Sequence, residues 1–231
     1  AGFDFPDREL DEELLALHHP DRYAIESGDV RSSGGLAFTA SEFDDHVVEH
    51  QVAHSTALHA ALDGRRYLTG PLARYSLNAA QLSPLARQAA AAAGLGLTCR
   101  NPFRSIVVRA VETVYAVEEA LRIIAAYERP QPPSIAVPPR AGVGRGVSEA
   151  PRGLCYHRYE LAADGRIVTA TIVPPTSQNQ AAIEEDLRAV AAANLHLPDD
   201  ELTAMCERAI RNHDPCISCA AHFLTLTVDR R

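Results

Sequence analysis

Apolar residues recur at steps of three and four over residues 103–125, the clearest hydrophobic pattern in the chain. The repeating positions are Phe103, Ile106, Val107, Ala110, Val111, Val114, Leu121, Ile124 and Ala125. Asn101 can cap a helix here, Pro102 can open it, and Pro130 follows its end. The pattern predicts one long helix that forms the spine of a bundle. Its solvated or interface side is expected to carry Glu112, Glu118 and Glu119.

Shorter helices are predicted on both sides of this long one. Asp7 can cap a helix that runs to about Leu17, with leucines on one side and Pro20 as its stop. Another is expected to start near Ser41 and to continue, with a successor, through the histidines that follow. The remaining helical patterns cover residues 84–94, about 179–195 and 202–211.

Turn residues between short apolar runs predict a smaller β component. Residues 23–38 form a plausible hairpin, and a second one joins residues 154–161 to 167–173 through Asp164-Gly165. Residues 130–152 are rich in proline and glycine and are expected to form a long loop. The sequence therefore predicts an α+β fold, predominantly helical. We expect one domain over residues 1–231, with a helix bundle around the long central helix and small β-hairpins beside it.

Composition narrows the function classes. The 231 residues are 46% hydrophobic and 23% charged, which is typical of a globular protein with a real core. The net charge of −8 argues against a nucleic-acid partner and against an anionic membrane surface. No apolar run approaches the roughly 20 residues of a membrane-spanning helix, and no signal-peptide pattern is visible.

The cysteines indicate a reducing compartment. There are five, an odd number without the spacing of a disulfide scaffold, so a cytoplasmic location is expected. Cys99, Cys155 and Cys206 have no partner at metal-ligand spacing and are interpreted as small packing residues.

Four histidines follow Ser41 at short intervals: His46, His50, His54 and His59. On a single continuous helix, the first three would share one face. Such a face could bind zinc or nickel. A polar or interface-facing stripe is the preferred interpretation, because no carboxylate–histidine signature accompanies the spacing.

The candidate chemistry is concentrated near the carboxy terminus, in Asp214-Pro215-Cys216-Ile217-Ser218-Cys219-Ala220-Ala221-His222. One backbone turn can direct Cys216 and Cys219 at a single soft metal ion. Taken alone, the CxxC spacing fits a redox dithiol or half of a zinc site as well.

The longer string DPCxxCxxH resembles the end of the large subunit of nickel-iron hydrogenases. Upstream strings resemble that family in the same order: HSTALHA (54–60), GPLARYSLN (70–78), RNPFRSI (100–106), EAPRG (149–153) and PPTSQN (174–179). They are most similar to the cytoplasmic, cofactor-coupled branch. The family's amino-terminal RxCGxC pair is absent from this sequence. The chain therefore resembles the carboxy-terminal part of such a subunit.

The resemblance implies roles for particular residues. The family's nickel is held by four thiolates, so Cys216 would be a terminal nickel ligand that also accepts a proton. Cys219 would bridge nickel to an iron that carries cyanide and carbon monoxide. Arg152, with Pro151 beside it, would sit above the metals, where it can bond a cyanide, and Asp214 would lie near that arginine.

The resemblance also implies roles for the turn at Pro174–Thr176, for His222 and for residues 223–231. The turn at Pro174–Thr176 would contact the second cyanide, with only Thr176 supplying a hydroxyl because Pro175 departs from the serine or threonine common there. His222 would bind magnesium. Residues 223–231 would be an extension that a maturation protease removes, although a terminal strand is the alternative because apolar residues and threonines alternate there.

The implied activity is the reversible oxidation of dihydrogen. Electrons would pass to an iron–sulfur small subunit and then to a nicotinamide-type acceptor, and nickel-insertion proteins would supply the metal. No glycine-rich nucleotide fingerprint is present in this sequence. With two of four thiolates, the chain alone is expected to be inactive. The alternatives are a hydrogenase-derived, non-catalytic structural or binding domain, and a zinc or redox CxxC protein.

Overall fold

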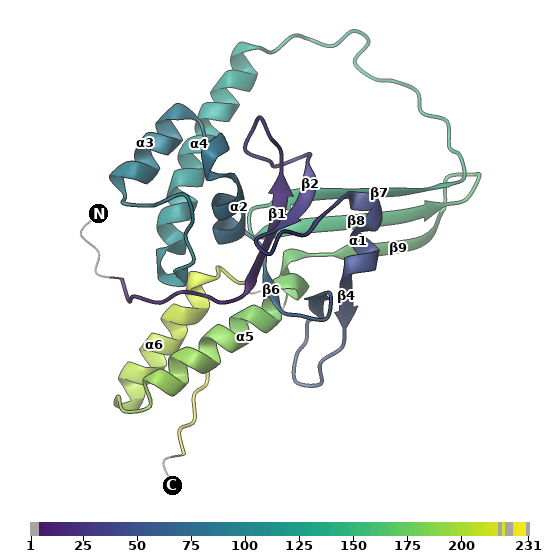
Figure 1. The fold of residues 1–231 in the computed structure, drawn as a ribbon. Coiled ribbons are helices and arrows are strands. Elements are labelled where there is room, and N and C mark those ends of the chain that lie inside the picture. Colours follow the sequence, from purple (N-terminus) through teal and green to yellow (C-terminus); the bar gives the residue numbers. More distant parts are fainter. Residues whose placement is uncertain (1–4, 217–218, 220–223, 230–231) are drawn as a thin grey trace.

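The computed structural model describes residues 5–216, 219 and 224–229. That part of the chain contains six α-helices and three small β-sheets. Figure 1 shows helices α2, α3 and α4 on one side, the long hairpin strands on the other, and α5 and α6 side by side below. The α+β class is therefore confirmed. A predominance of helix receives only loose support.

The first sheet has the strand order β3-β2-β1-β6, with β1 at Glu13–His18, β2 at Asp29–Ser32, β3 at Ala37–Phe38 and β6 at Tyr67–Leu68. The helix predicted over residues 7–17 is wrong, because its leucines belong to strand β1. Leu14 and Ala16 face one hydrophobic core, and Leu15 and Leu17 face another. A strand buried on both faces is a continuous apolar run, which a helical pattern also fits. The hairpin predicted over residues 23–38 is confirmed by β2 and β3.

The first core lies between β1 and helices α2 (Pro71–Asn78), α3 (Pro84–Ala92) and α4 (Ser105–Ala125). The predicted helix at 84–94 and the predicted long helix are both confirmed. The bundle around a central helix is not, because α4 lies at the periphery. Near its end, Leu121 is 62% exposed and Ile124 is 71% exposed.

Two of the glutamates assigned to the solvated side of α4 have specific partners. Glu112 accepts hydrogen bonds from Arg74 and from the Tyr23 hydroxyl. Glu118 accepts from Ser83 and from the Ala86 amide at the start of α3. Only Glu119 behaves as predicted, in an exposed pair with Arg122. Helical periodicity shows which way a side chain points and does not reveal its partner.

The second sheet pairs β4 (Val47–His50) with β5 (His59–Leu62), after a 3-10 turn (Ala40–Glu42) and the single-turn helix α1 (Phe43–His46). The predicted helix through His54 is therefore wrong. The β-branched pair Val47-Val48 starts the strand, in keeping with the strand preference of such residues. The strand register places His50 opposite His59.

The third sheet contains β7 (Gly142–Ala150), β8 (Gly153–Leu161) and β9 (Ile167–Val173) in sequential antiparallel order. The predicted hairpin is confirmed as β8 and β9. The long loop is confirmed only in its first part, because residues 142–150 form an edge strand against β8. Glycine alternates there with larger residues, and pairing with β8 overrides the low strand preference of glycine.

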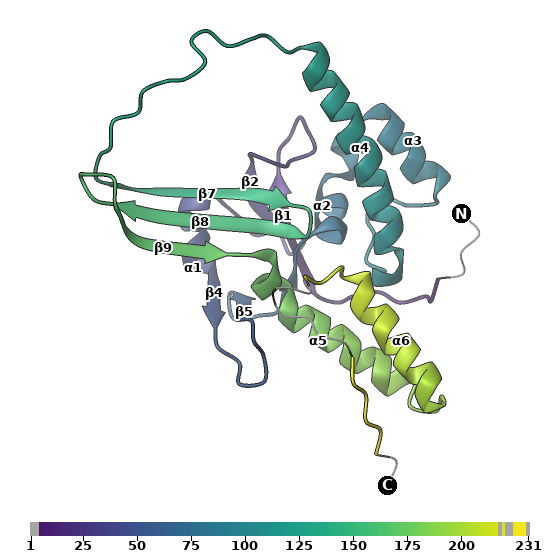
Figure 2. The same ribbon diagram turned by 180° about the vertical axis from the view of Figure 1, so that it is seen from behind.

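Helices α5 (Pro175–Ala193) and α6 (Asp199–Asn212) complete the described fold. Both begin earlier than predicted, since Pro175 occupies the first turn of α5 and acidic residues fill the first turn of α6. Seen from behind in Figure 2, α5 leaves the end of β9 and α6 returns beside it toward the other helices. Residues 224–229 form no strand, so the predicted alternative of a terminal strand is not supported in that range. Among the described helices, none has the length and apolar character needed to cross a bilayer.

Candidate metal centre

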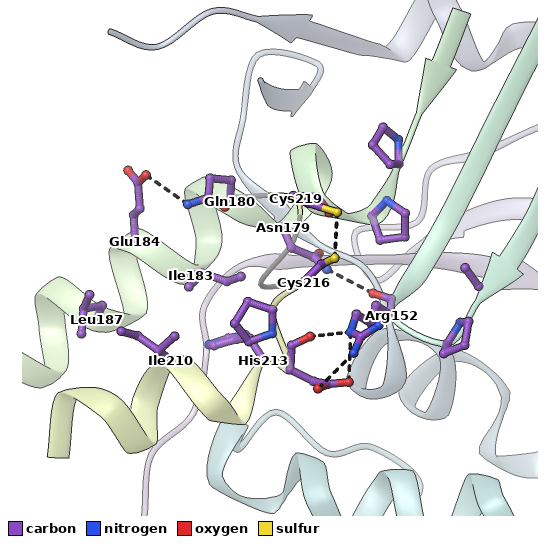
Figure 3. Close-up of a pocket in the computed structure, with 17 residues that line it drawn as sticks. Arg152, Asn179, Gln180, Ile183, Glu184, Leu187, Ile210, His213, Cys216 and Cys219 are labelled. Atoms are coloured by element: carbon purple, nitrogen blue, oxygen red, sulfur yellow. Dashed lines mark hydrogen bonds and ion pairs between the residues drawn. The ribbon is translucent and has the colours of Figure 1, made fainter. Parts of the chain in front are cut away.

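A cavity of about 370 Å³ lies where the β7–β8 turn, the start of α5 and the end of α6 meet. Its wall includes the site residues predicted from the sequence, namely Pro151, Arg152, Pro174, Thr176, Asp214, Cys216 and Cys219. Figure 3 shows the sulfur atoms of Cys216 and Cys219 facing each other, with Arg152 nearby on the β7–β8 turn. His222, the predicted magnesium ligand, lies outside the described residues. The structure thus brings three separate sequence strings together around one space.

The two thiols form a single cluster of soft donors. Cys219 Sγ lies 2.7 Å from Cys216 Sγ, and the Cys219 amide donates to the Cys216 carbonyl oxygen at 3.2 Å. Neither cysteine is part of a disulfide, and Cys216 is half-buried while Cys219 is exposed. Thiols so placed can hold one thiophilic metal ion, which would remove their protons on binding. The donor set fits half of a four-thiolate nickel site.

Arg152 is fixed by the segment that carries the thiols. Its Nε donates to the backbone oxygen of Asp214 at 2.7 Å and lies 3.2 Å from Asp214 Oδ2. Asp214 has a φ of +48°, in the left-handed region that aspartate tolerates better than most residues. This bend follows α6 directly and turns the chain toward Cys216. The guanidinium and the thiols therefore share the same cavity wall.

The turn that presents Arg152 is held by the helices beneath it. Arg74 donates from Nη1 to the Ala150 oxygen at 2.8 Å and from Nη2 to the Pro151 oxygen at 3.1 Å. Gly70 comes so close that a Cβ there would lie 2.6 Å from the Arg152 carbonyl oxygen. That same oxygen accepts from Asn179 Nδ2 at 3.2 Å. The backbone carbonyls of Ala150, Pro151 and Arg152 are thus hydrogen-bonded to Arg74 or Asn179, while the Arg152 side chain lines the cavity.

Arg74 is itself part of a buried charge network. It donates to Glu112 at 2.7 and 3.0 Å and to Glu149 Oε2 at 2.8 Å, while the Leu17 amide donates to Glu149 Oε1 at 2.9 Å. Burial raises the pKa of Glu149, and the adjacent Arg74 opposes this rise. Burial disfavours the charge of Arg74, but Glu149 and Glu112 hold its pKa well above the usual value. Arg74 therefore remains a cation beneath the β7–β8 turn.

Polar side chains at the start of α5 lock it against the sheets. Asn179 Oδ1 accepts from the Thr69 amide at 2.8 Å, and Thr69 Oγ1 accepts from the Leu154 amide at 2.9 Å. Gln178 Nε2 donates to the Leu154 oxygen at 2.6 Å. These contacts hold the turn at Pro174–Thr176 in the wall of the same cavity as Arg152.

The end of α6 is anchored by residues distant in sequence. His213 Nε2 lies 2.9 Å from Asp186 Oδ2, and Arg8 Nε donates to Asp186 Oδ1 at 2.6 Å. Burial acts to raise the pKa of Asp186, but its bonds to His213 and Arg8 dominate and lower it. On the other side, Ser105 Oγ donates to the Asn212 oxygen, as does Arg109 Nη1 at 3.2 Å. The end of α6 that leads into the bend at Asp214 is therefore fixed from two sides.

Sequence reasoning missed these supporting residues. Arg74, Glu149 and Asn179 lay inside strings already singled out, so a charged or amide residue within such a string was an available signal. Asp186 and His213 carried no comparable signal, because their pairing depends on how α5 and α6 pack. Of the cysteines interpreted as packing residues, Cys99 and Cys206 are buried as predicted. Cys155 is only half-buried, and its Sγ lies 3.3 Å from His157 Nε2.

Comparisons with known proteins agree with the geometry. A family model described as nickel-dependent hydrogenase matches residues 39–222. The chain is 32% identical to sulfhydrogenase 1 subunit alpha of Pyrococcus furiosus, over 89% of this chain and 48% of that protein. It is 32% identical to the NAD-reducing hydrogenase HoxS subunit beta of Cupriavidus necator, over 67% of this chain and 34% of that protein.

A solved structure shares the fold. The crystal structure of an NAD+-reducing [NiFe]-hydrogenase in the H2-reduced state superposes with a TM-score of 0.74 at 24% identity, over 93% of this chain and 51% of that one. This chain thus spans about half the length of the sulfhydrogenase subunit and of the solved chain, and about a third of the HoxS subunit.

Proposed function

Because this chain belongs to the nickel-dependent hydrogenase family, we propose that it forms the carboxy-terminal part of a hydrogenase large subunit and supplies half of the ligand set of a nickel-iron centre. The observation that carries this is the convergence of Cys216, Cys219 and Arg152 on one cavity. When bound, the centre supplies the redox chemistry that interconverts dihydrogen with protons and electrons. The remaining two thiolates come from an RxCGxC pair elsewhere in the complete subunit.

The residues of this chain have distinct tasks in that proposal. Cys216 and Cys219 would hold the metals as thiolates, Cys219 as a shared ligand and Cys216 as a terminal ligand that also accepts a proton at Sγ. Arg152 would supply a fixed positive charge and planar donors to the cyanide ligands, and its bond to Asp214 holds the guanidinium in orientation. Thr176 would offer a hydroxyl to the second cyanide. His222 would supply a magnesium ligand.

The partners follow from the same proposal. The complete subunit passes electrons to an iron–sulfur small subunit, and a nicotinamide-type acceptor is proposed because one relative is named an NAD-reducing hydrogenase. Nickel-insertion proteins deliver nickel in the cytoplasm, and a protease then removes residues 223–231. Intact mass of the mature subunit tests this last step, since an active subunit that retains Arg231 would contradict it. This chain by itself is proposed to be inactive.

The assignment of the thiols is tested in the complete subunit. Cys216→Ser and Cys219→Ser should each abolish dihydrogen-dependent dye reduction and lower the nickel content, because serine is a poor ligand for a soft metal. Cys155→Ser is the matched control, since Cys155 lies outside the cavity wall. Full nickel loading and activity in either of the first two variants would reject the assignment. If the chain were non-catalytic or zinc-binding, the unsubstituted subunit would already show no dihydrogen-dependent dye reduction.

A further inference from the structure

His54, His59 and Glu184 meet beside the cavity, although they come from three different elements. His54 lies in the β4–β5 turn, His59 begins β5, and Glu184 lies on α5, which packs against β5. His54 Nε2 lies 3.1 Å from both oxygens of Glu184, and His59 Nε2 lies 3.3 Å from Oε1. One donor atom from each residue can be chosen so that all three atoms lie within 4.8 Å of one another. Two imidazoles thus converge on one carboxylate.

The ion pair with Glu184 leaves the His59 Nε2 nitrogen without a hydrogen bond. The His59 side chain is only 6% exposed, and its Nε2 forms no hydrogen bond even though Glu184 Oε1 is 3.3 Å away. A buried polar atom without a partner is unfavourable, and such atoms are uncommon in folded proteins. The nitrogen lies within 4.8 Å of donor atoms of both Glu184 and His54, close enough for one ion to be shared by all three residues. A metal ion there would satisfy His59 Nε2 without moving the backbone.

The separations between Glu184 and the two histidines match those of a tetrahedral metal site. Zinc bonds of about 2.0–2.1 Å to nitrogen and oxygen place ligand atoms roughly 3.3 Å apart. The distances of 3.1 Å and 3.3 Å from Glu184 to the two histidines agree with that spacing. Two histidines and one carboxylate form a known zinc ligand set that leaves a fourth position for water. The His54 side chain is 66% exposed, so the ion and its water have a route in from solvent.

The carboxylate has support of its own. Gln180, one turn earlier on α5, donates from Nε2 to Glu184 Oε1 at 3.5 Å, and Figure 3 shows the two side chains joined in this way. Partners of this kind orient the ligands of metal sites. Both residues also line the cavity that contains Cys216 and Cys219. We propose that His54, His59 and Glu184 bind one divalent transition-metal ion of the zinc type, in a second site next to the thiol cluster and independent of it.

The test uses the full chain with Cys216→Ser and Cys219→Ser, so that the two thiols of the CxxC motif do not contribute. Equilibrium dialysis against Zn2+ should give one bound ion per chain. Co2+ in its place should give the absorption of a tetrahedral nitrogen–oxygen site, without a thiolate charge-transfer band. Glu184→Gln or His54→Ala, added to this background, should weaken Zn2+ binding by roughly 100-fold or more, since loss of an outer-shell partner alone costs about 10- to 100-fold.

His46→Ala is the matched control, because His46 Nδ1 also pairs with a carboxylate, Asp63 Oδ1 at 3.1 Å, in the same region but without a second histidine ligand. It should leave Zn2+ affinity unchanged. Glu184→Gln keeps the shape of the side chain, and circular dichroism of each variant confirms that it is folded. No Zn2+ uptake by the chain that lacks Cys216 and Cys219, or equal affinity in the His46 and Glu184 variants, would overturn the proposal. Because these two thiols are absent, either result leaves the proposed nickel-iron centre untouched.

Discussion

Arg152 Nε donates to the backbone oxygen of Asp214 at 2.7 Å, across a sequence separation of 62 residues. The bond joins the β7–β8 turn to the segment that carries Cys216 and Cys219. It therefore holds the Arg152 guanidinium in position relative to the two thiols. The acceptor of this bond is a backbone carbonyl oxygen. The orientation of the guanidinium therefore does not depend on the ion pair alone.

Arg152→Lys in the complete subunit should retain the metals and lose at least ~100-fold in turnover, the scale expected when one fixed electrostatic donor is removed. Lysine keeps the charge but cannot reproduce the planar donors that reach both Asp214 and the cavity. Metal analysis and dihydrogen-dependent dye reduction measure the two effects separately. Arg166→Lys, in an exposed pair with Asp164, is the control. Unchanged turnover with full metal content would place Arg152 outside the mechanism.

Gly70→Ala should displace the turn that carries Arg152. Gly70 has a φ of +107°, and a Cβ there would meet the Arg152 carbonyl oxygen at 2.6 Å. Gly35 has a φ of +93° with nothing within 4 Å, so Gly35→Ala shares the backbone penalty without the clash. That penalty is about 1–3 kcal/mol. Denaturant unfolding should show a clearly larger loss of stability for the Gly70 variant, and equal losses would show that the close approach has no consequence.

Arg74→Met should destabilise the fold by about 3–5 kcal/mol, because it leaves the buried Glu149 carboxylate without its cation. It also removes the donors to the Ala150 and Pro151 carbonyls. The free energy of unfolding from urea titration is the measurement. Arg122→Met, which breaks an exposed pair with Glu119, should produce no comparable loss. Similar midpoints for the two variants would show that the network contributes little to stability.

Asp186→Asn should change how stability depends on pH. The pKa of Asp186 is lowered in the folded chain by His213 and Arg8, against the effect of burial. A carboxylate with a depressed folded pKa contributes stability above its unfolded pKa of about 3.9, and that contribution is lost as pH falls through the folded value. The difference in unfolding free energy between wild type and variant should therefore be large at pH 6 and shrink in acid. A difference independent of pH would mean that the charge is irrelevant.

Local patterns predicted some elements well and others poorly, for identifiable reasons. The long helix, the helix after Pro84 and the β8–β9 hairpin were predictable because caps, periodicity and turn residues agree there. Leu14–Leu17 were misassigned because a strand buried on both faces has no alternation of polar and apolar residues. The strand at Gly142–Ala150 was missed because pairing with β8, and not its own composition, specifies it.

The candidate site, like the fold, could be predicted from the sequence only in part. Residues within the recognisable strings, such as Arg152 and Cys216, could be predicted to act together, and the structure places them on one cavity wall. The metal site proposed at His54 could not be derived from spacing, because the prediction assumed a helix and its carboxylate lies 130 residues away. Only the packing of α5 against β5 supplies Glu184.

The contacts that fix the thiol segment reach far along the chain, from Arg8 to Asp186 and from Ser105 to Asn212. Long-range contacts of this kind form late in folding, because a large loop must close before they are gained. During synthesis, the walls built from Arg152 and Thr176 emerge before Cys216, so they can assemble first. Cys216 and Cys219 would then pack against a cavity wall that has already folded. We expect an interval before this packing in which a metal-delivery protein has access to both cysteines.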